Sequence, residues 1–191
     1  MIFPEQSSSH RLPSAGVITV LGILILAAAG PLRAQAGAPA PEPPLSFDLK
    51  DQFDRAYTQA LCAGRIAVMV IADREGSKFS GPWSEAVGRG LTAAAAPATQ
   101  WVPVATLPAV PGFMRGFIKG KFPQKQEQWT LMDWGGSLAK AYGLSDKRCH
   151  VLVFGPDGRL LHHSGGREVD AAAVTAIVAA VAAAGSAGSQ R

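Results

Sequence analysis

The sequence predicts an α/β sandwich, in which a central mixed sheet is flanked by helices, and three patterns support this prediction. The run RIAVMVIA, residues 65–72, is continuously apolar over the length of one strand, as expected for a strand covered on both faces. The segment CHVLVFGPDGRLLHHSGG, residues 149–166, places the turn residues Pro-Asp-Gly between two apolar runs and predicts a β-hairpin. Strand and helix patterns alternate along the chain, which is typical of this fold class.

Residues 1–36 have the pattern of an export signal. Arg11 precedes an apolar run over residues 15–30, and Ala34-Gln35-Ala36 is a small-residue cleavage site. The run is short for a bilayer span, which needs roughly 20 residues, so we expect cleavage rather than a retained anchor. No Cys follows the run, so no lipid-attachment site is predicted. The proline-rich stretch 37–45 is then expected to be an extended linker.

The folded domain is expected to cover residues 46–183. It begins with residues 46–61, which form either a two-stranded hairpin or a hairpin whose second half is a helix. A long alanine-rich helix from residue 170 ends the domain, with its branched residues on one side, and a flexible Gly/Ser tail follows at 184–191. Between the two ends the patterns predict a helix ending before Pro97, a strand over 99–107 in which Pro103 indicates an edge or a bulge, a poor helix or loop over 112–122, a strand over 128–134 and a short helix over 136–144.

A family resemblance is visible in the second half of the domain. The stretch LMDWGGSLAKAYGLSDKRCHVLVFGPDGRLLHHSGG, residues 131–166, resembles exported thioredoxin-like proteins of the redoxin type in the order and spacing of its elements. FDLKDQF, residues 47–53, resembles the entry hairpin of these proteins, and RIAVMVIAD, residues 65–73, resembles their central strand. The resemblance covers about residues 46–183 and implies a thioredoxin-like sandwich. The motif that would fix an activity is missing.

That motif is Cys-x-x-Cys after the central strand, where a helix N-terminus lowers the pKa of the first thiol. This chain has no Cys between Cys62 and Cys149, and the segment Ser80-Gly81-Pro82-Trp83 has the outline of Cys-Gly-Pro-Cys. We interpret residues 80–83 as a degenerate active site. The alternative is that Ser80 is an ordinary helix N-cap with Pro82 in the first turn.

The resemblance implies two further features that this sequence lacks. The family places a cis-proline just before the strand of the final hairpin, and here Cys149-His150 takes that place, so a cis bond is not expected. The peroxidase version of the fold also needs a Cys after the central strand, and none is present. If residues 80–83 do not lie at the active end, Asp73, Arg74 and Glu75 are the candidates for it.

The two cysteines are not expected to form a disulfide, although export would permit one. Cys62 and Cys149 are predicted near opposite ends of the sheet, roughly 20 Å apart along the central strand, whereas a disulfide needs Cα atoms within about 7 Å. Two interpretations of Cys149 stay open. It is either a small buried hydrophobe, as is common for free Cys, or a lone accessible thiol and candidate catalytic residue.

The histidines of the hairpin form a candidate metal site. If residues 155–158 are the loop, Phe154 pairs with Arg159, which puts His150 opposite His163 with β-carbons about 5 Å apart, while His162 points to the other face. Two imidazoles at this distance can bind one metal, with copper favoured over zinc if Cys149 joined, or share a proton. The alternative is a half-packed pair with no ligand. We expect no resident cofactor.

Basic and aromatic residues alternate over residues 115–129. Arg115, Lys119, Lys121 and Lys125 are interleaved with Phe117, Phe122 and Trp129. This pattern suits a loop that docks on a partner or on an anionic surface, or else a solvated insertion with its aromatics packed on the domain. The formal net charge of the chain is only +4, so nucleic acid is not an expected partner for an exported protein of this kind.

Three functions are therefore compared. The favoured one is a non-catalytic binding or accessory domain in the bacterial periplasm, with another envelope protein as its partner and the membrane reached only through an uncleaved N-terminal segment. The second is a one-cysteine redox protein using Cys149, and thiol oxidoreductase or peroxidase-like chemistry is the expected kind if the protein is an enzyme. The third is a metal-binding protein using His150 and His163. Fold alone cannot decide among them.

Overall fold

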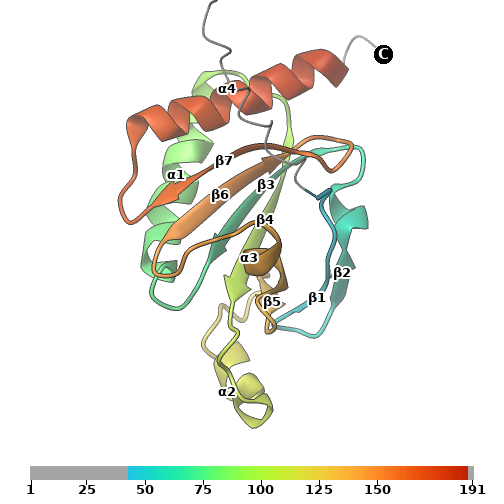
Figure 1. Ribbon diagram of the computed structural model, residues 1–191, viewed down its shortest axis with the longest axis vertical. Helices are drawn as coiled ribbons and strands as arrows, with labels where there is room; N and C mark the ends of the chain where they lie inside the picture. The colour runs from blue at the N-terminus through green and yellow to red at the C-terminus, as the bar shows by residue number, and fades with distance from the viewer. Residues whose placement is uncertain (1–42, 189–191) are drawn as a thin grey trace, which may run out of the picture. The chain divides into compact units, whose positions relative to one another are not determined.

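The computed structural model describes residues 43–188 (Figure 1), so the predicted signal segment, most of the predicted linker and the last three residues lie outside the described part. The elements form a single seven-stranded mixed sheet with strand order β2-β1-β5-β4-β3-β6-β7. In chain order they are β1 (Asp48–Asp51), β2 (Ala56–Thr58), η1 (Gln59–Cys62), β3 (Ile66–Ala72), α1 (Ser77–Ala93), β4 (Thr99–Thr106), η2 (Gly112–Met114), α2 (Arg115–Lys119), β5 (Leu131–Asp133), α3 (Ser137–Ala141), β6 (Cys149–Phe154), β7 (Leu160–Gly166) and α4 (Ala171–Gly188). The predicted α/β sandwich is confirmed.

Strand β3 is the centre of the sheet. It runs parallel to β4 and antiparallel to β6, and all seven of its residues are buried. Because successive side chains of a strand point to opposite faces, the apolar run supplies two cores at once. Met69 and Ile71 face one core, and Val68 and Val70 face the other.

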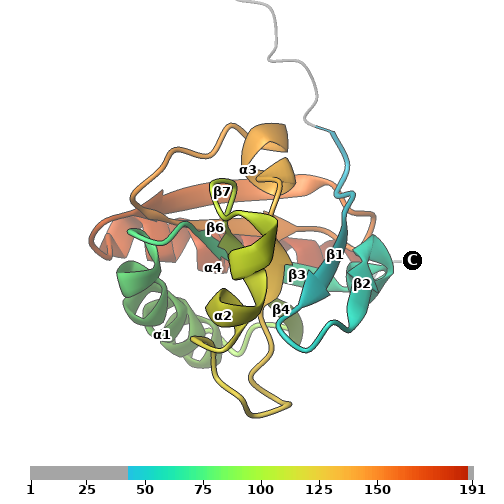
Figure 2. The same cartoon turned by 90° about the horizontal axis from the view of Figure 1, so that it is seen from below.

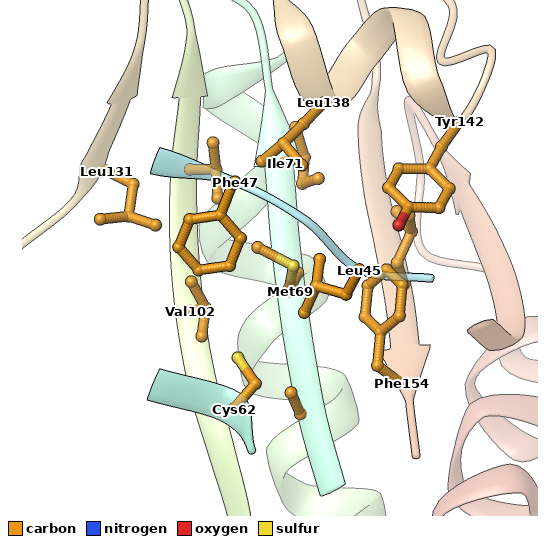
Figure 3. Packing of buried hydrophobic residues seen from close by; sticks show 13 residues of the cluster. Leu45, Phe47, Cys62, Met69, Ile71, Val102, Leu131, Leu138, Tyr142 and Phe154 are labelled. Atoms are coloured by element: carbon orange, nitrogen blue, oxygen red, sulfur yellow. The ribbon is translucent and has the colours of Figure 1, made fainter. Parts of the chain in front are cut away.

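The two faces of the sheet are covered differently. Helices α1 and α4 pack on one face, where Trp83, Val87 and Ile177 are fully buried. The other face is covered by α3, η1 and the chain segment that leads into β1 (Figure 3). There the side chains of Leu45 and Phe47 lie over Met69 of β3.

Both ends of the domain extend further than predicted. Leu45 was expected in the linker, but its side chain is buried and its amide donates to the carbonyl of Gly158 at 2.8 Å. At the other end α4 continues to Gly188 through part of the predicted flexible tail. The predicted apolar side of α4 is confirmed, since Ile177 and Val181 are buried and two further valines pack against the same core.

The prediction for Pro103 in β4 is consistent with the sheet. Strand β4 pairs with β5 only from Val104 onward, so at Pro103 it borders β3 alone.

The structure also decides between the two alternatives that the sequence left open for residues 46–61. Residues 46–61 form the β1–β2 hairpin, and the second half ends in the short 3₁₀ helix η1.

The final hairpin forms, but its register differs from the prediction by two residues. Gly155 rather than Phe154 is bonded to Arg159, and Gly158 adopts a φ of +77° in the turn. A bulge between Val153 and Phe154 then adds a second one-residue shift. As a result His150 lies opposite Gly165, and Leu152 lies opposite His163.

Candidate functional site

The end of β3 and the start of α1 form the edge of the sheet where the resemblance places an active site. The helix begins at Ser77 with Gly76 as its N-cap, so Ser80 is not the cap and Pro82 lies inside the helix rather than in its first turn. The expectation that residues 80–83 form the N-terminus of the helix is therefore wrong, and their interpretation as a degenerate active site stays a prediction. The helix N-terminus is supplied by residues 73–76, which includes the alternative candidates Asp73, Arg74 and Glu75.

The carboxylate of Asp73 is hydrogen-bonded to both loops at this edge of the sheet, which is here called the closed edge. One oxygen of its carboxylate accepts the backbone N–H of Gly76 at 2.6 Å, and the other accepts the backbone N–H of Lys147 at 2.9 Å. A carboxylate at a helix N-terminus is favourable because it faces the positive end of the helix dipole. Asp73 thereby joins the loop after β3 to the loop before β6.

The two loops also touch through their backbones. A side chain at Gly76 would lie within 2.2 Å of the carbonyl oxygen of Arg148, so only glycine fits there. Glu75 and Lys147 form an ion pair with 3.7 Å between their charged atoms. The carboxylate of Asp73 at the start of α1 thus already has two amide partners.

A small hollow of about 220 Å³ lies beside these loops. It is lined by three cations and one carboxylate around an aromatic ring: Lys78, Lys147, Arg167, Glu75 and Phe79. Of these five residues only Glu75 was a candidate from the sequence. The start of α1 places residues 75 and 78 together, and Asp73, whose carboxylate accepts the N–H of Gly76, is the local signal for that start. The contact of these residues with residue 147 depends on the tertiary structure.

The Ser80–Trp83 segment belongs to the core. Trp83 is fully buried between α1 and the sheet, and its indole N–H has no hydrogen-bond partner among the described residues. Ser80 is half-buried and hydrogen-bonds with the thiol of Cys149. Gly81 and Pro82 are exposed on the outer side of the helix. Two of the predicted site residues, Ser80 and Cys149, are therefore neighbours.

Cys149 is buried, which makes the interpretation of it as an accessible thiol wrong. Cys149 has no exposed surface, and this burial raises the pKa of its thiol to about 11. The hydrogen bond with Ser80 offsets only part of this increase in pKa. At neutral pH only about one thiol in ten thousand would be ionised at such a pKa, and the thiolate is the nucleophilic form. The alternative of a small buried hydrophobe describes Cys149 correctly.

The predicted absence of a disulfide is confirmed. Cys62 and Cys149 are both free and buried, and they belong to the cores on opposite faces of the sheet. Burial also raises the pKa of the Cys62 thiol to about 11. The peptide bonds of the described residues are all trans, including the bond between Cys149 and His150.

His150 and His163 are neighbours despite the change of register. Nδ1 of His150 lies 3.0 Å from Nε2 of His163, and Nε2 of His150 donates to the carbonyl of Ser145 at 2.8 Å. Since that carbonyl can only accept, a neutral His150 keeps Nδ1 as an acceptor, and His163 must donate through Nε2. His162 lies on the other face, as predicted, and its Nε2 is 2.6 Å from the hydroxyl of Ser164.

The pair favours the uncharged state. Burial lowers the pKa of His150, an effect that its bond to the Ser145 carbonyl opposes. Burial and then the charge of His150 lower the pKa of His163. Within residues 43–188 no group of three or more His, Cys, Asp or Glu residues is placed to hold a metal ion. The arrangement can share a proton between two imidazoles, and it offers at most two ligands to a metal.

The basic segment divides into a packed and an exposed part. Trp129 stacks on Tyr57 with ring centroids 5.0 Å apart, which matches the expectation of aromatics packed on the domain. Phe117 instead remains 62% exposed, with the ammonium of Lys121 4.6 Å from its ring centroid. Among the described residues no helix is long and apolar enough to cross a membrane.

Comparison with solved structures identifies the fold. An exposed lipoprotein thioredoxin of Streptococcus pneumoniae is 15% identical with a TM-score of 0.50, over 70% of this chain and 98% of that chain. BsSco, a member of the Sco family of cytochrome c oxidase assembly proteins, is 12% identical with a TM-score of 0.54, over 76% of this chain and 95% of that chain. The thioredoxin domain of a thiol-disulfide oxidoreductase from Bacteroides vulgatus is 9% identical with a TM-score of 0.51, over 75% and 99%.

The chain has a thioredoxin-like fold. The likeness at these identities concerns the fold alone, because unrelated activities are found on the same fold. No protein-family model matches the sequence, and no curated protein matches it.

Proposed function

We propose that this protein is an exported, non-catalytic thioredoxin-fold domain that serves as a binding or accessory protein in the bacterial cell envelope. The observation that carries the proposal is the closed edge at Asp73. Its carboxylate takes up the amides of Gly76 and Lys147, where a thiol-exchanging member of the fold would stabilise a thiolate. Residues 1–36 support export through their signal pattern.

The two other functions have less support from the geometry. A redox role for Cys149 needs an ionisable, reachable thiol, whereas this thiol is fully covered and its pKa is raised to about 11. A metal-binding role for His150 and His163 would rest on two ligands that are already bonded to each other. With both cysteines buried and the two histidines hydrogen-bonded to each other, the part of the chain that the structure describes is better suited to hold a partner than to transform a substrate.

The first test is a turnover assay on the purified exported protein. We expect neither thiol-dependent reduction of a protein disulfide nor peroxide turnover above a control without protein. Turnover that disappears in Cys149→Ser would overturn the proposal in favour of the one-cysteine redox protein. Cell fractionation with intact mass tests export separately, since a chain beginning at residue 37 in the periplasmic fraction is expected.

The second test restores the missing chemistry at the position that the structure indicates. Glu75 and Lys78 line the same hollow at the start of α1, on either side of Gly76 and Ser77, with the spacing of Cys-x-x-Cys. Glu75→Cys with Lys78→Cys should therefore give a dithiol that oxidises readily and gains disulfide-reductase activity. The matched control is Ser80→Cys with Trp83→Cys. This pair should neither oxidise readily nor gain disulfide-reductase activity, because Trp83 lies in the core. Activity only in the control pair would show that the active end has been misplaced.

A further inference from the structure

The segment between β4 and β5 carries a projection, defined here as residues 111–122, which contains η2 and α2. It stands out from the sheet beyond the end of β4, away from α4 (Figure 1), and it lies in the foreground when the molecule is seen from below (Figure 2). Its base is fixed. The side-chain amide of Gln52 donates to the carbonyls of Pro123 and Gln128 at 3.0 and 2.9 Å. The projection is therefore presented in a set orientation.

Its tip is apolar and uncovered. Phe113 is 88% exposed, Phe117 is 62% exposed and Met114 is 37% exposed, and these are three of the five large hydrophobic residues that are exposed among residues 43–188. Positions 113, 114 and 117 lie within about one helical turn, so their side chains form one patch. Burying a Phe side chain fully is worth about 1.5–3 kcal/mol, which the isolated domain does not gain here.

Cations are interleaved with the patch in the sequence, and acidic residues are missing from this stretch. Arg115, Lys119, Lys121 and Lys125 fall within residues 107–126, which contain no Asp or Glu. Lys119 forms an ion pair with Asp54. Arg115 and Lys121 lie over the rings of Trp134 and Phe117 instead, so their charges stay available to an anionic surface.

From this combination we infer that the projection docks on the surface of an anionic phospholipid bilayer, with Phe113 and Phe117 entering the headgroup region. Aromatic side chains flanked by Lys and Arg are typical of segments that bind at the membrane interface. The patch belongs to a segment that stands out from the sheet beyond the end of β4 (Figure 1), where a planar bilayer can reach it. This inference goes beyond the proposed accessory role and does not depend on the absence of thiol chemistry.

The test uses the full chain with an environment-sensitive dye on Met114→Cys. The native cysteines are buried, so the dye attaches selectively to the new thiol. With vesicles of equal parts phosphatidylglycerol and phosphatidylcholine we expect a blue shift of the dye emission, and none with phosphatidylcholine alone. The matched control is the same dye on Leu161→Cys, a position that is 45% exposed on β7, which should stay unshifted. The N-terminal apolar segment is the same in both chains and cannot cause a difference between them.

Two substitutions then test the charge. Each basic residue near an anionic surface contributes about 1 kcal/mol, so Arg115→Gln with Lys121→Gln should weaken binding to the anionic vesicles about 30-fold. Equal shifts at positions 114 and 161, or equal shifts with both kinds of vesicle, would overturn the inference. An absence of any shift would also overturn it and leave the projection to a protein partner.

Discussion

Replacement of Asp73 by Ala should destabilise the protein by about 2–3 kcal/mol. The change removes two hydrogen bonds, from the amides of Gly76 and Lys147. A capping-type bond is worth about 1 kcal/mol, and a second bond to a charged group adds about 1.5 kcal/mol. Loss of the carboxylate from the helix N-terminus costs about 0.3–1 kcal/mol more, and the contributions of one group are not fully additive.

Urea unfolding followed by tryptophan fluorescence measures this change, and native-state hydrogen exchange locates it. The amides of Gly76 and Lys147 should lose protection beyond the global change. Asp73→Asn keeps an acceptor and should cost less. The matched control is Asp146→Ala, an exposed carboxylate in the same loop before β6, which should stay within about 0.5 kcal/mol. If Asp73→Ala is no more costly than this control, Asp73 does not hold the edge closed and the argument for a closed site fails.

Three further predictions follow from the burial of single groups. Neither Cys62 nor Cys149 should react with a thiol reagent in the native protein, and both should react after unfolding, because burial raises both pKa values to about 11; rapid native labelling of Cys149 would contradict its placement. Trp83→Ala should lower the free energy of unfolding, measured in urea, by about 3–5 kcal/mol. The control Leu161→Ala, at an exposed position, should lower it by at most about 0.5 kcal/mol. Similar losses of stability in the two variants would place Trp83 at the surface. Burial lowers the pKa of His150 in the folded state, so the unfolded chain binds more protons and the free energy of unfolding should fall as the pH drops below about 6.5. His150→Gln should make the free energy of unfolding depend less on pH. An unchanged pH dependence in this variant would assign the effect to other groups.

The fold was predictable because its main elements are encoded locally. The run in β3 is apolar at every position, the Pro-Asp-Gly turn fixes a hairpin, and the branched residues of α4 recur at helical spacing. Each of these signals needs only neighbouring residues. The ends of the domain were less predictable, since Leu45 is held by a contact with Gly158 that lies far away in the sequence.

The start of α1 differs from the prediction, and only part of the signal that sets it is local. SGPW has good capping chemistry, with Ser80 ahead of Pro82, and the local pattern favours a helix starting there. The helix instead starts at Ser77, where Asp73 supplies the acceptor and the backbone of Arg148 packs against Gly76. The contact with Arg148 comes from the loop before β6, which lies outside residues 72–83, whereas the acceptor Asp73 lies within them.

The histidine pair shows how a correct contact can follow from an incorrect register. The turn moved the pairing by one residue, and the bulge at Val153 moved it by one more. Side chains of a strand alternate between faces with a period of two, so a single shift would have sent His163 to the α1 face, while two shifts returned it to the face of His150. The imidazoles therefore meet diagonally rather than directly, with 3.0 Å between their nearest nitrogens. A substitution that abolishes only the bulge should separate the pair, which makes the irregularity at Val153 part of what places His150 beside His163.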